Sequence, residues 1–310
     1  MTRTQIEYIL ALAKSKNFGI AAVECFISQS TLSAMIAKFE RQIDVELFSR
    51  KTRPIQTTIN GNKIIESLEN INREFLLLDE LIREINEVEK GKISLACIPT
   101  VAPFIYPLIL NKISNEFKHV DFNIYELTTE KIIQDIKGGK IDIGIVSLPL
   151  NTKDLVEYAL YEEEFFVYDF GNKQKSKRYK ITDIDLNRLW ILEEGHCMRN
   201  QIGKICDLRQ KKKMNGNLTY SCGSIDALIK MVNLNNGITL LPHLAIENNK
   251  NVDKRFIYTF QGQKPMRRVG IIVHKNFVRK RLLKQFIEII NTLLVLPKHS
   301  GKSLNYLKPV

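Results

Sequence analysis

The sequence lacks several features that would assign it to other classes of protein. No apolar run approaches the roughly 20 residues of a membrane span, and Met1 to Thr4 lead into a polar amphipathic pattern, unlike a secretory signal. Only five of the 310 residues are cysteine, and an odd, scattered set does not form a disulfide framework. We expect a cytoplasmic protein with no membrane partner, whose cysteines are thiols by default.

Motifs of several chemical classes are also missing. The sequence contains no Gly-x-Ser-x-Gly nucleophile elbow, no phosphate-binding loop and no cluster of residues with metal-ligand spacing. We therefore expect no enzyme activity, no cofactor and no metal. The missing export signal also argues against a solute-binding module.

What is present is an ordinary soluble composition with an excess of basic residues. The chain is 44% hydrophobic, and its 46 lysines and arginines outnumber 34 acidic residues, giving a net charge of +12. This balance favours a polyanionic partner such as double-stranded DNA, although a solvated basic surface would have the same composition.

The first 60 residues have the pattern of a helix-turn-helix. Residues 4–13 place apolar side chains on one helical face, residues 20–23 continue into a short second helix, and Ser28 is positioned to cap a third helix. Residues 46–58 mix β-formers, a proline and cations, as a wing beside a phosphate backbone would. An ordinary three-helix core is the alternative.

The outer side of the third helix is polar, and short polar side chains suit contacts to base edges and phosphates. The predicted DNA contacts lie on this helix and in the wing: Ser28, Gln29, Ser30, Thr31, Ser33, Lys38, Arg50 and Arg53.

A long periodic segment follows. Apolar residues alternate spacings of four and three, which predicts a helix over residues 61–88, about 42 Å long, with a coiled-coil seam. A helix of this length suggests pairing with a second copy of the chain. The predicted dimerisation residues are Ile64, Leu68, Ile71, Phe75, Leu78, Ile82 and Ile85.

From residue 91 onward the pattern alternates strand and helix, which predicts two α/β lobes with a ligand crevice at the strand ends. Thr100 and Thr129 follow two predicted strands and could offer hydroxyls to a small ligand, although threonine there is more often a cap or turn residue. The predicted strands include residues 93–98, 122–125, 141–146, 165–168, 190–192, 218–220, 238–241, 256–258 and 270–273.

Two cysteines in this region lie nine positions apart. Cys197 is next to His196 and near Arg199, at a predicted helix N-terminus, and all three features favour a thiolate. Cys206 falls on a predicted buried face. Nine residues of helix span about 13 Å, whereas a disulfide needs Cα atoms within roughly 7 Å, so bonding would require refolding. Spacing alone nevertheless favours two inert thiols.

An enzyme that uses Cys197 with His196, such as a thiol peroxidase or a hydrolase, is a further alternative. Neighbours in sequence rarely form a nucleophile and base pair, because their side chains diverge.

The chain resembles the LysR-type transcriptional regulators over nearly its whole length. Ala21-Ala22, residues 28–33 (SQSTLS) and residues 46–50 (ELFSR) match the family's winged helix-turn-helix. Residues 195–201 (GHCMRNQ) with Cys206, and segments 98–101 (IPTV) and 237–242 (GITLLP), resemble its hydrogen-peroxide-sensing members. Asn200 stands where an aspartate is usual, Lys204 lies inside the switch loop, and residues 298–310 have no counterpart.

The resemblance implies an α/β fold with an N-terminal winged helix-turn-helix, a linker helix and two Rossmann-like subdomains. It implies that Cys197 is the peroxidatic and Cys206 the resolving cysteine, and that Thr100, Thr129 and His196 bind peroxide near a supporting Arg267. It also implies a tetramer built from dimers, and control of antioxidant genes through RNA polymerase, with a cellular thiol reductant resetting the disulfide.

The expected domains are a head over 1–60, a linker over 61–90, subdomain I over 91–163 and 269–297, subdomain II over 164–268, and a basic tail over 298–310. The function predicted is a DNA-binding regulator that responds to hydrogen peroxide through a reversible Cys197–Cys206 disulfide. The alternative is a LysR-type regulator that senses a small metabolite between the lobes, with structural cysteines.

Overall fold

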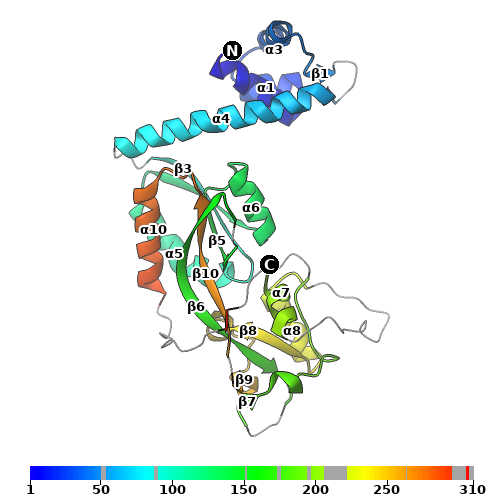
Figure 1. Cartoon of the computed structure of the whole chain (residues 1–310), viewed down its shortest axis with the longest axis vertical. Coiled ribbons are helices and arrows are strands. Elements are labelled where there is room, and N and C mark those ends of the chain that lie inside the picture. The colour runs from blue at the N-terminus through cyan, green and yellow to red at the C-terminus, as the bar shows by residue number, and fades with distance from the viewer. Residues whose placement is uncertain are drawn as a thin grey trace. The chain divides into compact units, whose positions relative to one another are not determined.

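The fold is described from a computed structural model (Figure 1), for residues 1–49, 54–86, 90–150, 152–172, 176–193, 197–205, 222–262, 264–294 and 305–306. Contacts divide the chain into two units, Met1–Asn86 and Glu87–Val310. We call them the head and the regulatory unit.

The head is a three-helix unit with a short wing. Its core is formed by apolar faces of all three helices, including Ile9, Leu32 and Ile36. Side chains cap each helix: Thr2, Asn17 and Ser28 accept backbone N–H groups of the first turns. The elements are α1 (Arg3–Ser15), α2 (Phe18–Glu24), α3 (Gln29–Ile43) and the antiparallel strands β1 (Phe48–Ser49) and β2 (Gln56–Thr57). This is the predicted winged helix-turn-helix.

The wing is attached to the third helix by a buried carboxylate. Glu40 on α3 accepts the backbone N–H groups of Leu47 and Phe48 at 2.8 and 3.2 Å. A carboxylate that satisfies two buried donors fixes the start of β1 relative to α3.

The linker helix α4 (Ile59–Ile85) is 27 residues long, and its first half packs onto the head. Leu68 is buried in the head core, with Ile64 and Phe75 packed against that core. The guanidinium of Arg3 lies 5.6 Å from the centre of the Phe75 ring and pairs with Asp79 at 2.9 Å. Of the predicted dimerisation residues, Leu68 is therefore buried within its own chain.

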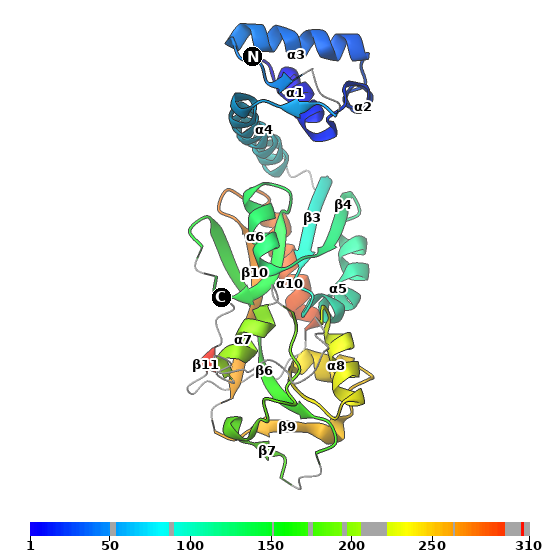
Figure 2. The same cartoon turned by 90° about the vertical axis from the view of Figure 1, so that its right-hand side faces the viewer.

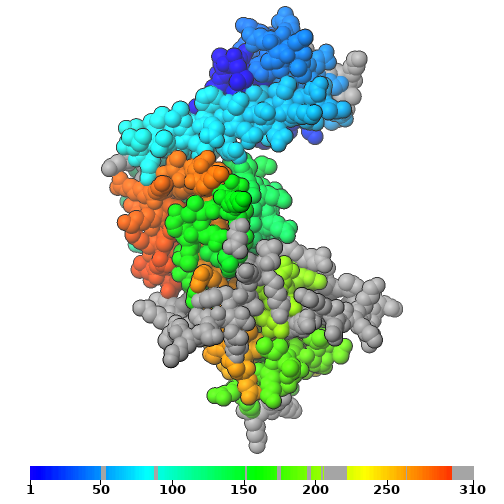
Figure 3. Space-filling model, viewed as in Figure 1, coloured from blue at the N-terminus to red at the C-terminus, as the bar shows by residue number. Residues whose placement is uncertain are grey.

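Four other positions of the predicted seam are exposed. Ile71, Leu78, Ile82 and Ile85 face solvent together with Leu76 and Leu81; α4 is the long cyan helix of the space-filling view (Figure 3). An apolar stripe of this size on a charged helix is typical of an association surface.

We expect Ile82→Glu to weaken self-association of the full chain by about 100-fold in dissociation constant. Two copies of a side chain are withdrawn from a symmetric contact, each contributing about 1.5 kcal/mol or more. Sedimentation velocity measures this change. Glu66→Gln, at an exposed polar position of the same helix, is the control, and a dimer unaffected by Ile82→Glu would exclude this stripe as the interface.

The regulatory unit contains two lobes that share two long strands (Figure 2). Lobe I has the parallel strands β3 (Gly91–Cys97), β4 (Val120–Glu126) and β5 (Ile143–Leu148) with helices α5 (Ala102–Glu116), α6 (Thr129–Lys137) and α10 (Lys280–Leu293). Lobe II has β7 (Arg178–Tyr179), β8 (Ile238–Pro242), β9 (Ile257–Phe260), α7 (Cys197–Ile205), α8 (Ile225–Leu234) and α9 (His243–Asn248).

The shared strands are β6 (Leu155–Asp169) and β10 (Pro265–His274). The first part of β6 runs antiparallel to β10, and its last part pairs with β8 and β9. The strand order is β4-β3-β5-β10-β6-β9-β7, with β8 on β6. A short strand β11 (Asn305–Tyr306) pairs in parallel with Pro265 and Met266 of β10.

The predicted fold class is confirmed, and one predicted strand differs. Residues 190–192 form no strand, and the neighbouring pairs Leu189 with Ile238 and Leu192 with Cys222 are isolated bridges. The strand predicted at 218–220 lies outside the described residues. Among the described helices, none is by itself long and apolar enough to cross a membrane; α2 and α3 meet that test only together, across a bend of 100°.

Candidate functional site

Three hydroxyl side chains meet at one edge of lobe I. Thr100 follows β3, Thr129 begins α6 just after β4, and Ser147 lies near the end of β5. Because β3 pairs in parallel with both β4 and β5, these strand ends lie side by side, where open α/β sheets bind ligands. All three residues are buried. The Thr129 hydroxyl has no hydrogen-bond partner among the described residues.

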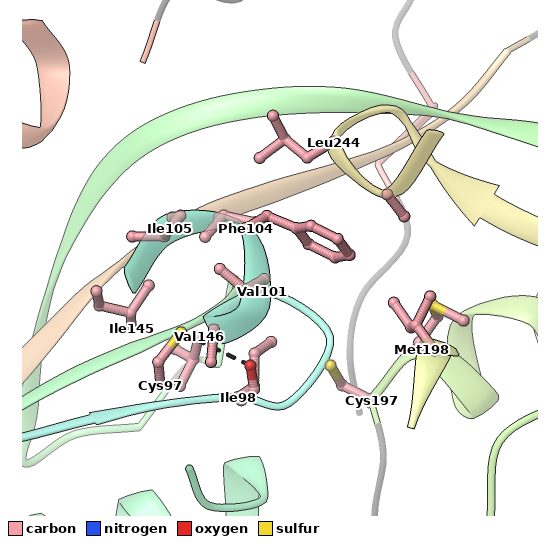
Figure 4. Close-up of a cluster of buried hydrophobic side chains, with 14 of the residues drawn as sticks. Cys97, Ile98, Val101, Phe104, Ile105, Ile145, Val146, Cys197, Met198 and Leu244 are labelled. Atoms are coloured by element: carbon pink, nitrogen blue, oxygen red, sulfur yellow. Dashed lines mark hydrogen bonds between the residues drawn. The ribbon is translucent and has the colours of Figure 1, made fainter. Parts of the chain in front are cut away.

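Cys197 of lobe II lies against this edge. It is the first residue of α7, is 5% exposed, and its Sγ is 3.6 Å from Ser147 Oγ. Figure 4 shows the Cys197 sulfur directed at the loop that connects Ile98 and Val101 of lobe I. The free N–H groups at the start of a helix carry partial positive charge and favour an anion such as a thiolate.

A buried ion pair contacts Thr100, the first of the three hydroxyl residues. Arg267 on β10 and Glu163 on β6 are both fully buried and 2.7 Å apart. Arg267 also donates to the Thr100 hydroxyl and carbonyl oxygens, each at 3.1 Å. Glu163 accepts the backbone N–H of Leu244 at 3.1 Å. The pair thus connects lobe I through Thr100 with lobe II through Leu244.

The charge of Arg267 is retained in this environment. Burial lowers its pKa, but Glu163 and the nearby Tyr161 and Cys197 outweigh that effect, so the pKa of Arg267 is raised overall. The guanidinium also lies 5.7 Å from the centre of the Phe165 ring. A permanent cation is therefore fixed close to the Cys197 sulfur.

Three other thiols lie in environments that oppose ionisation. Burial raises the pKa of Cys97 well above its usual value, with Glu126 adding to the effect. Burial likewise raises the pKa of Cys222 and of Cys25. Cys97 donates to the Ile98 carbonyl and Cys222 to that of Ser224. These cysteines are packing residues.

The structure brings together part of the predicted redox site. Thr100, Thr129, Arg267 and Cys197 are buried in one region, whereas His196 and Cys206 lie outside the described residues. Arg199 donates to the Leu192 carbonyl at 3.0 Å, which attaches the start of α7 to the rest of lobe II. Within the described ranges, no group of acidic, histidine or cysteine side chains could bind a metal.

Two residues of the site were missed by sequence reasoning. Glu163 is one of three consecutive acidic residues, a pattern that normally indicates a solvated segment. Ser147 interrupts the apolar run of β5, and that single polar position was the available signal.

Most of the predicted DNA contacts lie at the start of α3, and Lys38 lies further along that helix. Gln29, Ser30, Thr31 and Lys38 are exposed, and Ser33 is half-buried. Ser28 is engaged as the helix cap and lies within hydrogen-bond distance of the Ser30 and Thr31 hydroxyls. Arg50 and Arg53 lie outside the described residues. The polar N-terminal end of α3 is thus available to a partner.

Comparison with known proteins identifies the family. Residues 4–62 match the bacterial regulatory helix-turn-helix protein domain of the lysR family, and residues 86–294 match the LysR substrate binding domain. The chain belongs to the LysR family of regulatory helix-turn-helix proteins.

Individual relatives include regulators with different names. The HTH-type transcriptional regulator EstR of Acinetobacter baylyi is 29% identical over 275 residues, 88% of this chain and 90% of that protein. A hydrogen peroxide-inducible genes activator of Dickeya chrysanthemi is 27% identical over 274 residues, 88% and 89% of the two chains. A variant of full-length OxyR from Pseudomonas aeruginosa shares the fold, with a TM-score of 0.72 at 24% identity over 95% of this chain and 99% of that one.

Glu163→Gln should destabilise the regulatory unit by about 3–5 kcal/mol, because it leaves the buried Arg267 charge unpaired. Glu162→Gln removes the neighbouring carboxylate, whose pair with Arg268 is partly exposed, and should cost about 1 kcal/mol or less. Urea denaturation of the two variants measures the difference. Equal stabilities would show that the Arg267–Glu163 pair does not hold the lobes together.

Cys97 and Cys222 should resist alkylation in the native protein at neutral pH, because the thiolate is the reactive form and burial opposes its formation. Treatment with N-ethylmaleimide followed by peptide mass spectrometry reports each site. All thiols should react in denaturant, which serves as the control. Native Cys97 labelled as fast as in denaturant would contradict the assignment of this thiol to the core.

Proposed function

We propose that the chain is a DNA-binding transcription regulator that responds to hydrogen peroxide through oxidation of Cys197. The observation that carries this proposal is the position of the Cys197 sulfur, at the N-terminus of α7 and against the hydroxyl edge of lobe I. The buried cation of Arg267 lies near that sulfur. The name of the Dickeya chrysanthemi relative agrees with this function.

The chemistry begins with attack of the Cys197 thiolate on one oxygen of peroxide. The sulfur loses two electrons, the O–O bond breaks, and the leaving hydroxide takes a proton to become water, which leaves a sulfenic acid. Thr100 and Thr129 supply hydroxyls at the strand ends where peroxide would bind, together with His196. The thiolate of Cys206 then displaces hydroxide from the sulfenic sulfur and forms the disulfide.

Oxidation would change the contact between the lobes. Cys197 and Met198 belong to the buried core that both lobes share, so moving Cys197 toward Cys206 removes apolar contacts from lobe I. A packed interface of this kind rearranges between discrete states. The two lobes then shift, and with them the spacing of two heads on operator DNA.

The proposal includes partners and a location. A dimer forms through the exposed stripe of α4, and a tetramer from two dimers. The regulator acts on RNA polymerase at antioxidant genes, and a cellular thiol reductant returns the disulfide to thiols. The protein acts in the cytoplasm and has no steady catalytic turnover.

A second candidate is a regulator that senses a small metabolite in the same crevice. The similarity to EstR, whose name refers to no peroxide, favours it. In that case Cys197 and Cys206 are structural and Thr100 and Thr129 contact the metabolite.

The full chain treated with one equivalent of hydrogen peroxide should give a Cys197–Cys206 linked peptide by mass spectrometry, and its operator footprint should change. Cys197→Ser should abolish both effects. Cys222→Ser is the matched control and should leave both unchanged, because the Cys222 thiol is a packing residue. A footprint indifferent to peroxide and to Cys197→Ser would favour the metabolite sensor.

A further inference from the structure

Ser147 is placed to interact with the reacting sulfur. Its Oγ is 3.6 Å from Cys197 Sγ, and Ser147 is fully buried. β5 pairs with β3 as far as Ile145 and with β10 from Ile143 to Leu148, where Ser147 is opposite Val269. The hydroxyl therefore belongs to a rigid strand and is presented to the first residue of α7.

The Ser147 hydroxyl lies in an otherwise apolar buried strand, where it needs a hydrogen-bond partner. The rest of β5 is Ile143, Gly144, Ile145, Val146 and Leu148, all buried. A buried hydroxyl in such a strand costs about 1–3 kcal/mol unless it forms a hydrogen bond. The hydrogen bond that the structure gives to the Ser147 side chain is with the Cys197 sulfur.

The neighbouring cation is occupied elsewhere. Nε and Nη2 of Arg267 contact Glu163, and Nη1 and Nη2 contact Thr100. Arg267 thus contributes charge without a hydrogen bond to the sulfur, whereas Ser147, among the described residues, has its hydroxyl within hydrogen-bonding reach of the sulfur. The charge of Arg267 and the hydrogen bond of Ser147 can therefore be tested by separate substitutions.

We propose that Ser147 is a catalytic residue of the peroxide reaction, because its hydroxyl stabilises the Cys197 thiolate by a direct hydrogen bond. In the thiol, Cys197 S–H donates to Ser147 Oγ. When the proton leaves, the serine hydroxyl rotates and donates to the sulfur anion. Hydrogen bonds to ionised groups are about twice as strong as neutral ones, so this reversal favours the thiolate.

The hydroxyl also orients the nucleophile. The thiolate attacks one peroxide oxygen, the O–O bond breaks, and hydroxide leaves and is protonated to water. Throughout this step Ser147 keeps its own proton and occupies one side of the sulfur, so peroxide must approach from another side. Ser147 therefore raises the fraction of Cys197 present as thiolate and also determines the side from which peroxide approaches the sulfur.

This inference rests on the proposed peroxide function, and its test is made in full-length Cys206→Ser protein so that the sulfenic acid accumulates. Ser147→Ala should slow trapping of the Cys197 sulfenic acid by dimedone after peroxide addition by about tenfold or more, the loss of one hydrogen bond to an ionised group. It should also shift the pH profile of Cys197 alkylation by iodoacetamide to higher pH. A merely structural role would not move that profile.

Two further variants serve as controls. Ser147→Thr keeps a hydroxyl and should retain the original pH profile. Thr239→Val removes another buried hydroxyl, from β8 of lobe II, and should change neither measurement. If Ser147→Ala does not fold, Ser147→Thr and Thr239→Val still carry the test, and a folded Ser147→Thr protein with a shifted profile would overturn the proposal.

The outcomes separate this inference from the proposed function. Unchanged trapping rate and pH profile in folded Ser147→Ala protein overturn the role of Ser147 while peroxide sensing stands. A Cys197 that resists peroxide but whose alkylation profile shifts in Ser147→Ala supports the hydrogen bond and overturns the peroxide function.

Discussion

The regulatory unit depends on one buried charge. A guanidinium with no exposed surface must have its charge and its donors satisfied by the protein, and Arg267 meets this requirement with Glu163 and Thr100. Because Glu163 also accepts the Leu244 N–H, satisfying this charge fixes a strand end of lobe I and a helix of lobe II in one arrangement. The hydroxyl edge near Cys197 follows from that arrangement.

Neither lobe contains the site alone. Lobe I contributes Ser147, Thr100 and Thr129, whereas lobe II contributes Cys197 at the start of α7. The Cys197 sulfur is therefore part of the packing between the two lobes, unlike a thiol in a surface pocket. Any reaction at this sulfur would change the contacts between the lobes.

Local sequence patterns predicted the helices and strands better than the contacts between them. The caps of the head, the long α4 and the strands of lobe I could be read from residues close in sequence. Only the last part of β6 was predicted, because acidic residues such as Glu162 to Glu164 normally indicate a solvent-exposed segment. In the structure they belong to a 15-residue strand, where each of these three carboxylates pairs with a cation on β10 or next to it. Leu68 was assigned to the dimer interface because periodicity predicts which face of a helix is apolar but not which element that face packs against. The contact of Ser147 with Cys197 joins positions 50 residues apart, which no local pattern encodes.

The short strand β11 covers an edge of the sheet. On one edge of β10, Met266 pairs with Glu164 of β6. On the other edge, Met266 pairs with Tyr306 of β11, and β5 pairs with this same edge from Arg268 onward. Without β11, the backbone N–H and C=O groups at the beginning of β10 would form an open sheet edge, a template for pairing with another chain. Asn305 and Tyr306 thus pair with the first residues of β10, the strand that carries the buried Arg267.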